Sequence, residues 1–171
     1  GQSVSTINTS DANLNLKEFV TFSGGQFLKI NDDATLDIGT GDFSIFFVIA
    51  FTDTGSGNKE AIVARDDEDS VWSDNRWYTV EWTRDSGTET LYVDGVNQGS
   101  SASNTENLSA VAAVKMFIGA SSSGGNKDDY LTGRMAWFAM WTGTALSAAD
   151  RVAVNEYIKD RYLRTPQVDV A

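Results

Sequence analysis

The residues best suited to chemistry lie in one short polar segment. Residues 70–76 read SVWSDNR, so polar neighbours surround the indole of Trp72. Asp74, Asn75 and Arg76 add hydrogen-bond acceptors and donors beside it. Such a group could bind a polar ligand, with the indole as a flat apolar surface. The alternative is that Trp72 folds back to cover the core, and the sequence leaves both open.

A second polar segment, NKDDY at residues 126–130, offers another set of binding groups. Asn126 and Asp128 would supply hydrogen-bonding groups, and Tyr130 would supply an aromatic ring. The pattern favours a different interpretation, in which this segment is a solvated connector and Tyr130 begins the next strand.

Oxygen atoms dominate the side chains that could hold a metal ion. The chain has no Cys and no His, so thiolate and imidazole ligands are excluded and Ca²⁺ is the candidate cofactor. Asp128 and Asp129 are candidate ligands. The acidic run at residues 66–69 lacks the glycine and the spacing of an EF-hand loop.

The residue types that common hydrolases need are missing. Without histidine there is no Ser-His-Asp triad. The adjacent acids at residues 66–69 would point to opposite faces of a strand. Glu81, between Val80 and Trp82, should face away from the core, and a solvated strand face is favoured over the alternative of a groove carboxylate, because it is one acid without a partner. The sequence therefore predicts that the protein is not an enzyme.

The charge and composition of the chain limit the classes of partner that it could bind. With 24 acidic and 13 basic residues, the net charge of −11 disfavours binding to nucleic acid and to anionic membranes. The longest apolar run, residues 45–51, is too short to insert across a bilayer. A length of 171 residues fits one domain, and the absence of cysteine favours a bacterial or viral origin.

A β-meander must position these groups. Residues 77–96 read WYTVEWTRDSGTETLYVDGV, with two alternating apolar and polar runs around a polar turn at residues 84–87. A second turn at Asp94-Gly95 reverses the chain again. One face of the meander should carry the core residues Val80, Trp82, Leu91 and Val93.

Further strands surround the meander in the sequence. Residues 17–30 indicate two short strands, and the apolar run at residues 42–51 indicates a strand that is buried on both faces. Residues 114–119 and 133–141 are also expected to be strands, with a Gly- and Ser-rich loop at residues 120–129 between them.

Near the end of the chain the spacing of apolar residues changes from every second residue to every third or fourth, which predicts an amphipathic helix at residues 148–163. Ser147 is its expected N-cap, with the carboxylate of Asp150 three residues later. Trp137 and Trp141, on one face of the last strand, are expected to pack against it, whereas an exposed Trp137 would offer a flat binding surface. The apolar face of the helix consists of Val154, Tyr157, Ile158 and Tyr162.

Four segments in order resemble the laminin-G-like, concanavalin A-like lectin/glucanase superfamily in its bacterial and phage variants. They are FSGGQFLKI at residues 22–30, GTGDFSI at residues 39–45, the meander at residues 77–95, and GRMA at residues 133–136 followed by ALS at residues 145–147. Each motif is loose by itself, but the ordered combination is specific to a fold.

This resemblance implies an all-β jelly roll, a sandwich of two antiparallel sheets with one C-terminal amphipathic α-helix. The expected organisation is an N-terminal arm or edge strand at 1–18, the sandwich at 19–146, the helix packed on it at 147–163, and a tail at 164–171. The resemblance also implies that Asp42 lies where this superfamily often keeps a structural Ca²⁺. Neither the paired-carboxylate strand of its glucanases nor the Gln-x-His strand of its lyases is present.

Two functions follow from the resemblance. The first is a non-catalytic carbohydrate-binding or adhesion module that acts outside a cell or at its surface and binds a polysaccharide or other glycan. The second is a virion component, a capsid decoration or head-fibre protein. It would use the same fold for self-association, for assembly with capsid or tail proteins, or for attachment to glycans on a host surface. Fold alone does not separate the two.

Overall fold

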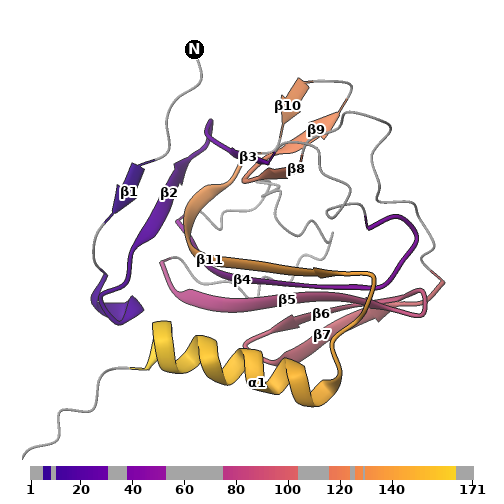
Figure 1. The fold of residues 1–171 in the computed structure, drawn as a ribbon. Helices are drawn as coiled ribbons and strands as arrows, with labels where there is room; N and C mark the ends of the chain where they lie inside the picture. Colours follow the sequence, from indigo (N-terminus) through magenta and orange to yellow (C-terminus); the bar gives the residue numbers. More distant parts are fainter. Residues whose placement is uncertain are drawn as a thin grey trace, which may run out of the picture.

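The structure is a computed structural model that describes residues 6–8, 11–30, 38–52, 75–103, 116–123, 126–128 and 130–164. Its main element is a curved antiparallel sheet of seven strands (Figure 1). The strands, in spatial order, are β1 (Thr6–Asn8), β2 (Phe19–Ser23), β11 (Thr132–Thr142), β4 (Phe43–Phe51), β5 (Trp77–Asp85), β6 (Thr88–Val93) and β7 (Val96–Ser101). The edge strand β1 lies within the predicted arm or edge strand at residues 1–18.

Strand β4 lies at the centre of this sheet and separates two hydrophobic cores. All of its residues are buried, which confirms the prediction of a strand covered on both faces. Because side chains alternate along a strand, Phe47 and Ile49 enter one core and Phe46 and Val48 enter the other. The second core, on the helix side, consists of Leu14, Phe46, Val48, Ala50, Trp77, Ile158 and Tyr162.

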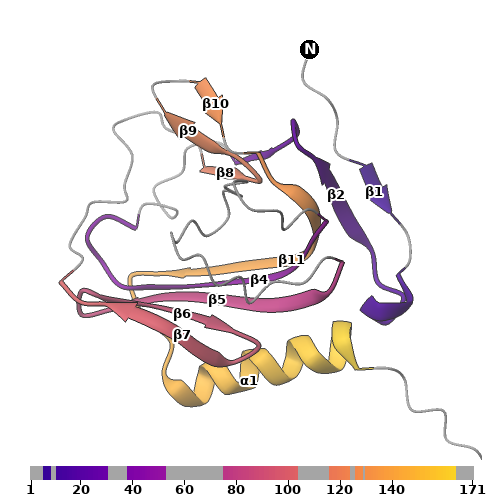
Figure 2. The same cartoon turned by 180° about the vertical axis from the view of Figure 1, so that it is seen from behind.

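Helix α1 (Ala148–Ile158) lies across the outer face of the sheet, as Figure 2 shows. It continues as one π-helical turn (Lys159–Leu163). The two together cover the predicted helical span. The Oγ of Ser147 accepts the amide of Asp150 at 3.2 Å, which confirms the N-cap. Tyr157 was expected on the apolar face but is 48% exposed, because its ring lies at the margin of the interface.

A β-bulge in β11 decides which side chains reach the helix. The register with β4 shifts between Met135 and Trp137. As a result, Ala136 and Trp137 both lie on the helix side, while Met135 packs in the other core. Trp137 and Trp141 therefore pack against the helix-side core, as predicted, and the rings of Trp137 and Tyr157 have centroids 6.0 Å apart.

The predicted meander is present, but its first turn is tighter than expected. Strand β5 extends to Asp85, and only Ser86 and Gly87 form the turn, with φ values of 50° and 78°. Arg84 was placed in this turn by the sequence pattern, yet it lies within the strand and is fully buried. The core face is confirmed, since Val80 and Val93 are buried and Trp82 and Leu91 pack against the same core.

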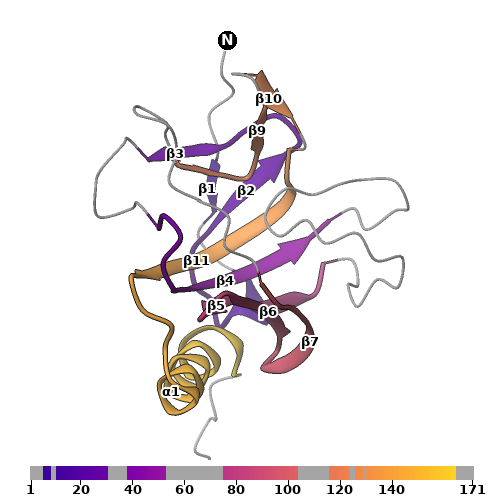
Figure 3. The same ribbon diagram turned by 90° about the vertical axis from the view of Figure 1, so that its right-hand side faces the viewer.

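A second layer covers the other core. Strand β3 (Leu28–Ile30) pairs with β8 (Met116–Ile118), and β9 (Ser121–Ser123) pairs with β10 (Asn126–Asp128) (Figure 3). The second pair corrects the expectation of a loop at residues 120–129, because hairpin pairing overrides the low strand propensity of serine. The protein is thus mostly β with one C-terminal helix, consistent with a jelly roll. In the described part of the chain, the second layer consists of these two short pairs rather than one continuous sheet.

No helix among the described residues is long and apolar enough to cross a membrane.

One glycine in β11 is required by close approach of the backbone. Gly133 pairs with both Phe22 and Phe51, and a Cβ there would lie 2.5 Å from the carbonyl oxygen of Ala50. We expect Gly133→Ala to lower the free energy of unfolding by about 1–3 kcal/mol, measured by urea denaturation. The control is Gly25→Ala, whose Cβ would meet no atom within 4 Å. Equal stability of the two variants would contradict this prediction.

Candidate functional site

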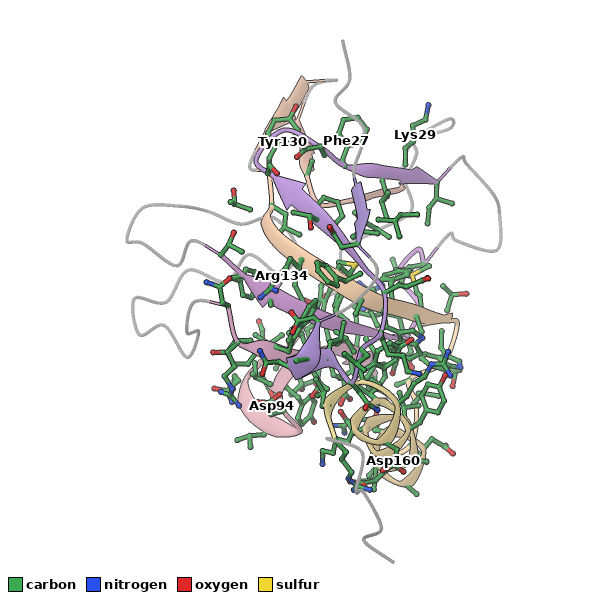
Figure 4. The ribbon with its side chains drawn as sticks, turned by 90° about the vertical axis from the view of Figure 1, so that its left-hand side faces the viewer. Phe27, Lys29, Asp94, Tyr130, Arg134 and Asp160 are labelled. Atoms are coloured by element: carbon green, nitrogen blue, oxygen red, sulfur yellow. The ribbon has the colours of Figure 1, made fainter. Side chains whose placement is uncertain are left out.

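A cleft of about 520 Å³ lies between the β6–β7 turn and the C-terminal end of the helix. Figure 4 shows Asp94 on this turn, at the end of the molecule that carries the helix. Trp77 and Leu163 form the apolar part of the lining. The polar part consists of Asn13, Asn75, Arg76, Thr79, Asp94 and Lys159.

An ion pair lies in this cleft. Nη2 of Arg76 donates to Oδ2 of Asp94 at 2.5 Å, and the guanidinium carbon lies 4.4 Å from the centre of the Tyr78 ring. Oδ1 of Asp94 accepts the backbone amide of Thr79 at 3.0 Å. The side chains of Arg76 and Asp94 are 57% and 31% exposed, so both remain accessible to a ligand.

The chain that leads into β5 is held rigidly beside this pair. Asn75 has a left-handed φ of 62°, a conformation that Asn tolerates, and its amide donates to the carbonyl of Phe51 at 2.7 Å. Nη2 of Arg134 donates to the carbonyl of Asn75 at 3.2 Å, and Nη1 of Arg134 donates to Oδ2 of Asp11 at 2.7 Å. The indole of Trp77 donates to the same Asp11 oxygen at 3.1 Å. This side of the cleft is therefore preorganised.

The helix contributes the opposite wall. Nζ of Lys159 donates to Oε1 of Glu156 at 3.1 Å, and the two side chains are 40% and 46% exposed. The hydrogen bond from Lys159 lowers the pKa of Glu156 below its ordinary value, so this carboxylate is ionised near neutral pH.

A second cleft of about 310 Å³ lies next to the first and has Glu81 in its lining. The expectation of a solvated Glu81 is wrong, because helix α1 covers this face of the sheet and leaves the residue only 2% exposed. One oxygen of its carboxylate accepts a hydrogen bond from Nε of Arg151, and the other accepts one from the side-chain Nδ2 of Asn155 at 3.3 Å. Burial raises the pKa of Glu81, against the effect of these partners. The guanidinium carbon of Arg151 also lies 3.8 Å from the centre of the Tyr92 ring.

The structure brings only part of the predicted binding groups together. Asn75 and Arg76 line the first cleft as neighbours. Trp72 and Asp74 fall outside the described residues. Figure 4 shows Tyr130 at the opposite end of the molecule from Asp94, so the two predicted groups do not form one site.

The second predicted set of binding residues, 126–130, also differs from its expected secondary structure. Asn126 and Asp128 belong to strand β10 rather than to a loop, and their side chains are outside the description. Tyr130 is half-buried and lies two residues before β11, so it does not begin that strand as the connector interpretation expected.

The candidate calcium ligands do not gather in the described part of the chain. Oδ1 of Asp42 accepts the amide of Ser86 at 2.8 Å, so this oxygen supports the β5–β6 turn. Among the described residues, no three acidic side chains come close enough to hold a metal ion. Asp129 and the side chain of Asp128 lie outside the description, so calcium binding stays a prediction.

Sequence reasoning missed Thr79, Asp94 and Lys159 as cleft residues. The strand register of the meander could have identified Thr79 and Asp94 as neighbours, because pairing of Val80 with Val93 places Asp94 beside Thr79. Only the packing of the helix against the sheet could have located Lys159.

Comparisons with known proteins agree with this architecture. Residues 20–150 match the family model described as the concanavalin A-like lectin/glucanases superfamily. One similar solved structure is domain 4 of AbnA, a GH43 extracellular arabinanase from Geobacillus stearothermophilus, in complex with arabinotriose. The likeness covers 92% of this chain and 81% of that one, with a TM-score of 0.56 and 13% sequence identity, so it concerns the fold alone. No curated protein matches the chain.

Proposed function

This chain belongs to the concanavalin A-like lectin/glucanase superfamily, and we propose that it is a non-catalytic carbohydrate-binding module. Its site is the cleft between the β6–β7 turn and the helix. The same proposal places the protein outside a cell, where it meets polysaccharide.

The observation that carries this proposal is the accessible Arg76–Asp94 pair in the cleft. A guanidinium presents several N–H donors in one plane, and a carboxylate presents several acceptor lone pairs. Neighbouring hydroxyls of a sugar ring are donors and acceptors at once, so they match such a pair. Asn75 and Thr79 hold the pair's surroundings in place, which lowers the entropy lost on binding.

The arabinanase domain supports the choice of ligand class by analogy. That domain has the same fold and was solved with an oligosaccharide, arabinotriose. At 13% identity the likeness does not extend to individual contacts. It therefore supports carbohydrate as the class of ligand and does not indicate which sugar binds.

The non-catalytic part of the proposal rests on the state of the acids in the two clefts. Asp94 and Glu156 are paired with cationic side chains, and Glu81 is 2% exposed with both carboxylate oxygens held by Arg151 and Asn155, which opposes the placement of two carboxyls on either side of a glycosidic bond that hydrolysis needs. Long incubation with a bound polysaccharide should release no new reducing ends. Release that depends on Glu81 would contradict this part and leave the binding proposal intact.

The virion role predicted from the sequence stays a prediction. Sedimentation velocity tests it, because an assembly protein should form stable oligomers without sugar, whereas a binding module should sediment independently of its own concentration.

Arg76→Ala is expected to weaken binding of the retained glycan by about 10–100-fold, since hydrogen bonds to a charged group contribute about 1.5–3 kcal/mol. Affinity electrophoresis in gels that contain neutral polysaccharides identifies the ligand, and titration calorimetry measures the loss. The fold should be retained, because an exposed ion pair contributes about 0–1 kcal/mol to stability.

The matched control is Arg161→Ala, which removes an exposed arginine that lines neither cleft. Its affinity should equal that of the unaltered protein. If both variants bind equally well, the glycan binds elsewhere and the site assignment is wrong. If no polysaccharide retards the unaltered protein, the proposed function is wrong.

A further inference from the structure

The two clefts are neighbours that share two wall residues, Asp94 and Lys159. We propose that they form one groove along helix α1, and that this groove binds several consecutive units of a linear, uncharged glycan. This inference rests on the proposed function and adds the length and charge of the ligand.

One ridge of the helix forms the wall of the groove. Ala148, Val152 and Glu156 line the second cleft, and Lys159 lines both. Residues three or four apart lie on the same side of a helix, so these four side chains form a single row. From Ala148 to Lys159 the row spans about 16 Å at 1.5 Å per residue, which is longer than one sugar ring.

The second cleft also contains an acceptor without a partner. Asn155 is only 8% exposed, and its Nδ2 donates to Glu81 and to the carbonyl of Arg151 at 3.0 Å. Its Oδ1 is buried and has no hydrogen-bond partner in the structure. A buried acceptor in this state is unfavourable, and because the atom is closed to solvent, a donor in the cleft would satisfy it only after the Asn155 side chain turns toward the lining. A sugar hydroxyl is a donor of the right kind, and Asn155 belongs to the cleft lining.

The charges of the groove are balanced within the protein. The three pairs are Arg76 with Asp94, Arg151 with Glu81, and Lys159 with Glu156. Among the described residues, each cation of the groove is already offset by a carboxylate of the protein, so the carboxylate of a uronic acid would meet no uncompensated positive charge. The net charge of −11 also repels polyanions. A neutral polyol meets neither obstacle.

The first experiment compares affinities across ligand charge and length. Gels that contain neutral polysaccharides should retard the protein, and gels that contain polygalacturonate or alginate should not. Oligosaccharides of the retained polysaccharide, from disaccharide to hexasaccharide, are then titrated by calorimetry. Affinity should rise with length and reach a plateau when the groove is filled, because each added unit makes new contacts.

A second experiment closes the far half of the groove. Val152 is 62% exposed and lines only the second cleft, so Val152→Trp should fill that cleft without disturbing the core. We expect it to weaken hexasaccharide binding about tenfold, and to leave unchanged a disaccharide bound beside Arg76. Ala153→Trp is the control, because Ala153 is exposed on the same helix and lines neither cleft.

The outcomes separate the two proposals. If Val152→Trp binds all lengths normally while Arg76→Ala loses affinity, the extended groove is wrong and the carbohydrate-binding function stands. Retention by the polyuronates as strong as by neutral polysaccharides overturns the charge argument. If no carbohydrate binds, both proposals are wrong.

Discussion

Arg151→Met is expected to lower the free energy of unfolding by about 3–5 kcal/mol near neutral pH, because it leaves the buried carboxylate of Glu81 without its cation. Glu81 is 2% exposed, whereas the side chain of Arg151 is 20% exposed, so most of the lost free energy comes from the unpaired carboxylate. Chemical denaturation at a series of pH values measures the effect.

The same variant should lose less stability in acid. Burial raises the pKa of Glu81 above its ordinary value of 4.5, while Arg151 opposes this shift. A carboxyl with a raised pKa in the folded state favours folding most below its unfolded value, and this advantage disappears as the pH rises through the raised pKa. Without Arg151 the pKa rises further. The difference in stability between variant and unaltered protein should therefore be smallest near pH 4.5 and grow toward neutral pH.

Two comparisons isolate the buried charge as the cause. Adding Glu81→Gln to Arg151→Met removes the charge and should restore most of the lost stability. Arg164→Met breaks exposed pairs with Glu156 and Asp160 and should cost under about 1 kcal/mol at every pH. A loss from Arg151→Met that is small and independent of pH would show that Glu81 is solvated after all.

Arg84→Met is the second substitution with a large expected cost, about 3–5 kcal/mol by urea denaturation. The Arg84 side chain is fully buried. Its Nε and Nη2 donate to the carbonyls of Gly41 and Gly39, each at 2.8 Å. The carboxylate of Glu89 lies 3.8 Å from Nη1, and its Oε1 has no hydrogen-bond partner. Methionine fills similar space but leaves these acceptors and the carboxylate unpaired.

Arg84→Lys separates geometry from charge. Lysine keeps the cation but cannot donate two planar bonds to both carbonyls, so its stability should lie between those of Arg84→Met and the unaltered protein. Arg76→Met, which acts on the exposed arginine of the same strand region, should change stability by less than about 1 kcal/mol. Equal stabilities of Arg84→Met and Arg76→Met would mean that burial of Arg84 contributes nothing.

Local pattern was sufficient for the meander and the helix, but not for the β9–β10 pair, which was expected to be a loop. The alternation in residues 77–96 identified the meander and its core face, and the change of period after Ser147 identified the helix. These features depend on neighbours along the chain, so short windows of sequence contain them. The same windows misplaced Arg84, because a two-residue turn and a longer polar turn share one composition.

The candidate site was predicted only in part for a related reason. Asn75 and Arg76 were identified from their residue types, and they do line a cleft. Asp94 was recognised as a turn residue but not as the partner of Arg76, a pairing that depends on strand register.

The burial of Glu81 could not be predicted from the sequence pattern. Alternation correctly directed its side chain away from the core that contains Val80. Periodicity states which face a residue occupies, but not what covers that face. Helix α1, which begins well over sixty residues later in the chain, packs on that face and converts an expected surface acid into a buried ion pair that lines the groove. The meander and the helix were therefore determined by local periodicity and turn chemistry, whereas the site was created by contacts between distant segments, which only the folded chain brings together.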